Sequence, residues 1–284
     1  MFGVEFLEGG GSLLKDSTMR PTYLAAMLSV LPLFAEAAPV TIDVTKLPKA
    51  TQVVDDVVVP IPSEVFAALD KLGKPKWAES VRPVKGLMVP AGGREQVALV
   101  LGTVIADGFV AVQAESVEEV KQVGSLVRQL AKAIGVERAV TRHATAIVEA
   151  ADRRAWNEVK RELDGAIKDV RAAMTELNNG ALSQLVSVGG WLRGTEVLAA
   201  VVGKQYSADG AELLQQPLLA DHFAVRLTEL EKGARTPLIG VVRTGLSRIN
   251  EVMGTGDTRL AQEHVRQIGR ISGELVLQIT ERSK

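Results

Sequence analysis

Two stretches of this sequence are apolar almost all round, and they constrain the fold more than any other feature. They span residues 97–112 and 185–202. A helix of this kind either lies at the centre of a bundle or crosses a membrane, which takes about 20 apolar residues. The first stretch is shorter than that and contains Asp107, and the second contains Arg193 and Glu196. A charge at the bilayer centre costs about 2.5–3.5 kcal/mol on insertion scales. We therefore predict two core helices buried in protein, in a chain that is not an integral membrane protein once its signal segment is removed.

The rest of the chain after Pro90 has the periodicity of amphipathic helices. Ser116 and Glu119 have the spacing of a capping box, which predicts a helix that Gly135 ends. Further apolar stripes predict helices over residues 136–152, 154–177, 237–253 and 257–282. Such stripes bury against one another, so the sequence predicts an all-α fold, an antiparallel helical bundle of about eight long helices over residues 91–284.

The order of these helices suggests an internal pseudo-repeat. Each apolar stretch is followed by a serine cap, Ser116 or Ser207, then by an amphipathic helix and two more helices. Sliding the sequence by 101 residues places residues 140–142 on residues 241–243. Two pseudo-repeated four-helix halves explain this pattern, and a chance match of helical stripes explains it as well.

Residues 38–90 form a proline-rich arm that precedes the bundle. Proline interrupts long helices and central strands, so this arm is expected to be extended, with one short helix over residues 63–72. Residues 53–59 are β-prone, but they are flanked by prolines and fit an extended segment lying on a helical surface equally well. The prolines of the arm are Pro39, Pro48, Pro60, Pro62, Pro75, Pro83 and Pro90.

Residues 1–37 have the order of a secretory signal peptide. Arg20 precedes an apolar core over residues 23–34, and Ala35 and Ala37 form a small-x-small cleavage pattern. We therefore expect export to the periplasm or the extracellular space, with cleavage near Ala37. Residues 1–18 are either upstream of a true start at Met19 or part of a long basic segment. The alternative is a cytosolic protein whose N-terminal helix packs on its core.

Composition excludes several classes of function. The net charge of -1 and a pI near 6.4 give none of the basic footprint that nucleic acid requires. The absence of cysteine excludes disulfides, thiol catalysis and thiolate metal sites. His143, His222 and His264 stand apart in the sequence, so we expect no metal and no cofactor. His264 falls on an apolar stripe and is expected to be a core residue, and His143 faces the nearby acids of its own helix, Glu149 and Asp152, poorly.

The candidate site joins the two core helices. Arg193 and Glu196 are three residues apart and can pair on one helix face, and Asp107 can reach Arg193 if the helices are neighbours. Trp191 would add a flat wall, and the surrounding glycines would allow close backbone approach or leave room for a ligand. One interpretation is a pocket in which Arg193 holds a small anionic ligand. The other is a satisfied ion pair that fixes how the helices dock.

Three functions follow from these features, in order of preference. The first is an exported, non-enzymatic protein of the bacterial envelope that acts as a binding or scaffolding module. The second is a periplasmic bundle that senses or binds a small anionic solute. The third is a hydrolase, which ranks last because no catalytic motif is complete in the sequence.

Overall fold

The computed structural model describes residues 52–54, 57–59, 75–232 and 237–281. The predicted signal peptide and the predicted helix over residues 63–72 lie outside the described residues. The described part is all-helical apart from one hairpin, in which β1 (Gln52–Val54) pairs antiparallel with β2 (Val57–Val59). The β-prone run of the arm is therefore a pair of strands, and β2 contacts helix α8.

Eight of the described helices have 15 to 25 residues, which confirms the predicted bundle of about eight long helices. Two short helices accompany them, the 3-10 helix η2 (Trp77–Ser80) and α7 (Ala208–Glu212). The long ones are α2 (Arg94–Gln113), α3 (Val117–Ala133), α4 (Glu137–Asp152), α5 (Trp156–Glu176), α6 (Gly180–Lys204), α8 (Pro217–Glu231), α9 (Leu238–Met253) and α10 (Gln262–Thr280).

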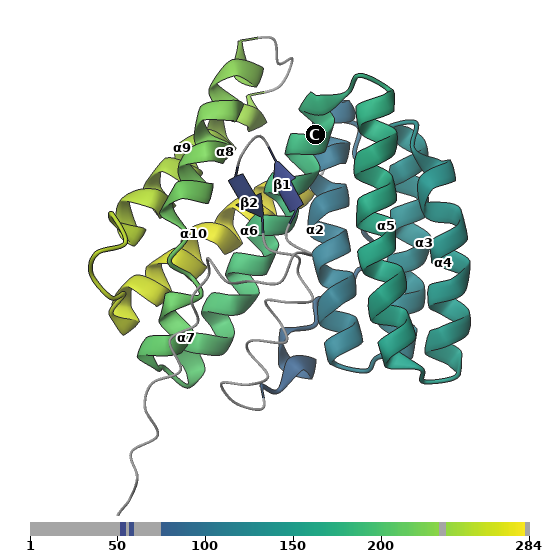
Figure 1. Cartoon of the computed structure of the whole chain (residues 1–284), viewed down its shortest axis with the longest axis horizontal. Coiled ribbons are helices and arrows are strands. Elements are labelled where there is room, and N and C mark those ends of the chain that lie inside the picture. Colours follow the sequence, from purple (N-terminus) through teal and green to yellow (C-terminus); the bar gives the residue numbers. More distant parts are fainter. Residues whose placement is uncertain (1–51, 55–56, 60–74, 233–236, 282–284) are drawn as a thin grey trace, which may run out of the picture. The chain divides into compact units, whose positions relative to one another are not determined.

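The two apolar stretches are α2 and α6, and they form the most extensive helix pair of the fold. Figure 1 shows them side by side. Helices α3 and α5 pack on α2, and α4 packs on α3 and α5. On the other side, α10 and α8 pack on α6, and α9 packs on α8 and α10. By length and composition alone both helices could cross a membrane, yet 89% of the most apolar window of α2 and 67% of that of α6 are buried inside the protein. Core helices of a bundle pass the same test of length and composition, and this burial is what they show.

Glycine brings the backbones of α2 and α6 into direct contact. A Cβ at Gly102 would lie 2.7 Å from the backbone nitrogen of Gly190 and closer still to the carbonyl oxygen of Val186. A Cβ at Gly189 would lie 2.9 Å from the carbonyl carbon of Leu99. No side chain fits at either position, so of the two roles considered for these glycines, close approach is the one they have at this crossing.

Most helices begin or end at the capping and helix-breaking residues of the sequence. Gly135 and Gly254 have positive φ and end α3 and α9 as predicted. Ser207 caps α7, because its hydroxyl accepts a hydrogen bond from the backbone nitrogen of Gly210. Ser116 lies at the N-cap of α3, but its side chain makes no capping hydrogen bond, so the predicted capping box does not form. The amphipathic helix expected after Ser207 is split into α7 and α8, which begins at Pro217.

The predicted repeat is supported by helix spacing but not by packing. A shift of 101 residues carries α4 (Glu137–Asp152) onto α9 (Leu238–Met253). In contrast, α2 packs more closely on α3 than on α5, whereas α6 packs more closely on α10 than on α8. The two-half relationship therefore stays a prediction.

Residues 75–90, the end of the arm, pack on the two core helices, and we call them the strap. Trp77 and Val84 are buried within the hydrophobic core, and η2 contacts both α2 and α6. Glu79 binds Lys204 at the end of α6, with 2.6 Å between the carboxylate and Nζ. The strap therefore covers the α2/α6 pair and positions the polar groups described next.

Candidate functional site

The structure joins three of the four predicted site residues in one buried cluster. Nε of Arg193 on α6 donates to Oδ1 of Asp107 on α2 at 2.7 Å. Nη1 of Arg193 donates to Oε2 of Glu196, one helical turn further on, at 2.9 Å. The side chains of Asp107 and Arg193 are 1% and 6% exposed, so this ion pair lies inside the protein.

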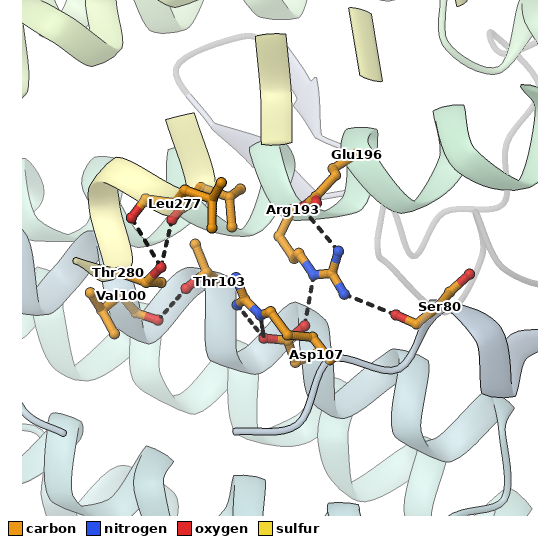
Figure 2. A network of polar contacts seen from close by, with 10 residues as sticks. Ser80, Val100, Thr103, Asp107, Arg193, Glu196, Leu277 and Thr280 are labelled. Carbon is orange, nitrogen blue, oxygen red and sulfur yellow. Dashed lines mark hydrogen bonds and ion pairs between the residues drawn. The ribbon is translucent and has the colours of Figure 1, made fainter. Parts of the chain in front are cut away.

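The strap completes the cluster with two groups that the sequence analysis missed. Nη2 of Arg193 donates to the carbonyl oxygen of Ser80 at 2.9 Å, as Figure 2 shows. Arg82 donates through Nε to Oδ2 of Asp107 at 3.1 Å, and its Nη2 pairs with the same oxygen. We call Arg82, Asp107, Arg193 and Glu196 the core quartet. It contains two positive and two negative side chains, so its formal charges balance.

The electrostatics of the core quartet favour the charged form of Arg193. Burial alone would lower the pKa of Arg193, but the charges of Asp107 and Glu196 and the hydrogen bonds to them outweigh it, so this pKa is raised above its usual value. All three guanidinium nitrogens of Arg193 and both carboxylate oxygens of Asp107 have partners within the chain. The polar atoms of Arg193 and Asp107 are thus all paired, and their charge-assisted hydrogen bonds tie the strap, α2 and α6 together.

Trp191 does not face the core quartet. Its indole nitrogen donates to the side-chain oxygen of Gln216 at 2.9 Å, and its ring meets Phe223 edge-on, with 5.9 Å between ring centroids. Trp191 therefore anchors α6 to the region where α8 begins. Trp191 therefore does not form the predicted flat wall beside Arg193.

A second charged cluster lies between α4 and α5. Nδ1 of His143 is 2.7 Å from Oε2 of Glu162, and Nε2 is 3.0 Å from Oδ2 of Asp169. The exposed side chain of Arg142 also reaches Asp169, at 3.2 Å. The sequence analysis compared His143 only with acids of its own helix, but its partners lie on the next one.

His264 differs from its predicted role. His264 is exposed, and its Nδ1 accepts a hydrogen bond from the backbone nitrogen of Ala261 at the start of α10. The prediction of a core histidine is wrong because Val265, one residue later, takes the buried position. Within the described ranges, no group of three or more histidine or acidic side chains has a geometry that could hold a metal ion.

An apolar cavity lies inside the half formed by α2, α3, α4 and α5. Its volume is about 40 Å³. Valine, isoleucine, leucine, alanine and glycine make up its whole lining, which includes Gly108 of α2, Val123 of α3, Ala144 of α4 and Ala166 of α5. Such a cavity offers no hydrogen bond to water and is expected to be dry.

Comparison with known proteins identifies no relative of this chain. No family model, no curated protein and no solved structure matches the chain. The geometry of the two charged clusters is therefore the basis for any functional conclusion.

Proposed function

We propose that this chain is an exported, non-enzymatic helical protein of the bacterial envelope that acts as a binding or scaffolding module. The observation that supports this proposal is the closure of the core quartet. The buried charges of Asp107 and Arg193 are directed at each other, at Glu196 and at the strap, so their clearest role is to fix a rigid helical framework. A framework of this kind presents surfaces to an envelope protein rather than a reactive centre to a substrate.

The alternative function is the sensing or binding of a small anionic solute at Arg193. Arg193 is the right residue type, because a guanidinium binds carboxylate and phosphate groups through two parallel hydrogen bonds. Its nitrogens, however, already donate to Asp107, Glu196 and the carbonyl oxygen of Ser80. A ligand would have to displace one of these partners, so the geometry favours the structural role. A hydrolase remains the third candidate, and the geometry of neither charged cluster favours it over the other two.

Export is tested by the processing of the N-terminus in a bacterial host. We expect the periplasmic fraction to contain a chain that begins at Ala38, identified by mass spectrometry of the intact protein. Ala37→Arg should block cleavage because it places a large charge where the pattern needs a small residue. Glu36→Gln is the matched control, since it changes the variable position of the same pattern. An uncleaved chain in the cytosol would contradict export.

The choice between scaffold and anion-binding protein is tested by ligand-induced stabilisation. A ligand that binds the folded state raises the melting temperature as its concentration exceeds Kd. We expect phosphate, sulfate and acetate to shift the melting temperature of the wild type and of Arg193→Met by the same small amount. A shift found in the wild type and absent from a folded Arg193→Met variant would favour the anion-binding function instead.

A further inference from the structure

The cluster around His143 is separate from the core quartet, and a histidine between two carboxylates lies at its centre. The side chain of His143 is 6% exposed, and each of its two ring nitrogens lies within hydrogen-bond distance of a carboxylate oxygen. Glu162 and Asp169, which supply these oxygens, are seven residues apart on α5 and approach the ring from opposite ends.

The protonation state of the ring decides whether both contacts attract. An ionised carboxylate only accepts hydrogen bonds, and a neutral imidazole has only one N–H to donate. Both contacts of His143 are therefore hydrogen bonds only when the ring is an imidazolium. After the loss of one proton, a nitrogen lone pair faces a carboxylate oxygen, and that contact becomes repulsive.

The backbone of α5 is shaped to receive this ring. A Cβ at Gly165 would lie 2.8 Å from Cε1 of His143, so glycine leaves the space that the imidazole occupies. Nη2 of Arg142 on α4 lies 3.4 Å from Nε2 and, since a guanidinium only donates, can form a hydrogen bond there only when this nitrogen carries no proton. This longer contact competes with the 3.0 Å contact between Nε2 and Asp169, which needs the proton. In the part of the chain that the structure describes, α3, which also packs on α4, contributes no ionic contact to the ring.

The cluster lies beside the apolar cavity, at the contact between α4 and α5. We call this contact the α4/α5 seam. Val140 and Ala144, on either side of His143 in the helical sequence, line that cavity from α4. Leu163 and Ala166, which flank Gly165 on α5, line it from the other side of the seam. Loosening of this seam would therefore give solvent a path to the apolar interior.

We propose that His143 is a pH-dependent clamp, whose imidazolium holds α4 to α5 and whose deprotonation loosens the seam over the apolar cavity. Acid opens the same clamp when Glu162 and Asp169 become protonated and no longer accept from the ring.

Amide hydrogen exchange of the full chain tests the clamp directly. Wild type and His143→Gln are compared over a series from about pH 5 to pH 8, the range in which histidine changes charge. At the acid end we expect amides of α4 and α5 to be about tenfold or more better protected in the wild type, as for a lost charge-assisted hydrogen bond. This ratio should fall towards one at the alkaline end. A ratio that does not change with pH would overturn the proposal.

A matched control and a second measurement keep the test decisive. His264→Gln alters an exposed histidine outside the seam and should leave the ratio in α4 and α5 unchanged. If His143→Gln does not fold, ring ¹⁵N spectra of the wild type report the proton count of His143. We expect protons on both nitrogens while the seam is protected, and a neutral ring in a protected seam would refute the clamp.

Discussion

Arg193 binds through each of its guanidinium nitrogens to another group of this chain, and at the scale of single residues this fact governs what a substitution does. A buried ion pair contributes little net stability when both partners are present, because desolvation offsets much of the attraction. Removal of one partner costs more, since the remaining buried groups lose charge-assisted hydrogen bonds that nothing replaces.

We predict that Arg193→Ala destabilises the protein by about 1.5–3 kcal/mol, because Oδ1 of Asp107 would lose its hydrogen bond while Oδ2 keeps its ion pair with Arg82. Urea unfolding followed by circular dichroism measures this loss. Arg243→Ala is the matched control, because Arg243 pairs with Glu231 at 2.7 Å on the surface and should contribute about 0–1 kcal/mol. Equal losses in the two variants would contradict a structural role for the core quartet.

The contact of Asp169 with His143 predicts that the α4/α5 seam loses stability at acid pH. The hydrogen bond with His143, partly opposed by burial, lowers the pKa of Asp169 below its usual value. A carboxyl group whose pKa is depressed by folding stabilises the native state above its unfolded pKa, and this stability is lost as the pH falls through its folded pKa. We expect Asp169→Asn to be less stable than the wild type at neutral pH and to lose less stability between about pH 5 and pH 2. Parallel acid-unfolding curves for the two proteins would contradict this coupling.

At the scale of the helix, local signals explain what the sequence could predict. The stripes of α4, α5 and α9 and the glycines that end α3 and α9 act within a few residues, so the predicted and observed bounds agree closely. The sequence also placed Asp107, Arg193 and Glu196 together, because one helical turn and one helix pair bring them into contact.

What the sequence could not predict depends on contacts between distant segments. Ser80 and Arg82 reach the core quartet only because the strap crosses α2 and α6, and nothing in a proline-rich run specifies that path. Glu162 and Asp169 were missed for the same reason, since the register of α5 against α4 sets their position. His264 was misplaced because steps of three and of four both fit a helical stripe, and the step of three from Ile268 selects Val265.

The α2/α6 crossing gives a prediction at this scale. Gly102→Ala and Gly189→Ala place a methyl group against backbone atoms that cannot move aside, and overpacking of this kind costs about 1–3 kcal/mol or more. Gly194→Ala on α6 is the matched control, because a Cβ there has no atom within 4 Å and alanine favours the helix by about 0.5–1 kcal/mol. Thermal unfolding of the three variants distinguishes the crossing from helix propensity. Equal stability of Gly189→Ala and Gly194→Ala would show that the backbones are not in contact.

At the scale of the whole molecule, α2 and α6 are each covered by other helices on more than one side. Most residues of α2 are buried, and they contact α3 on one side and α6 on another. A half of the bundle expressed alone would expose one such apolar surface to water, and an apolar face of this size promotes association.

We predict that residues 38–284 stay monodisperse without detergent, whereas residues 75–178, which contain α2 to α5, aggregate unless detergent or the complementary fragment is present. Size-exclusion chromatography with light scattering measures both states. A requirement of the longer chain for detergent would show that α2 and α6 are shielded by lipid rather than by protein. A soluble, folded fragment would show that the halves are independent.

The direct meeting of the α2 and α6 backbones also has a mechanical consequence. Interfaces made of side chains can yield by rotamer changes, but main-chain atoms pressed together at Gly102 and Gly189 leave no such slack. The two helices are then expected to move together as one rigid body. A tilt imposed on α2 from its own half would be carried across the crossing into the half around α6 with little damping.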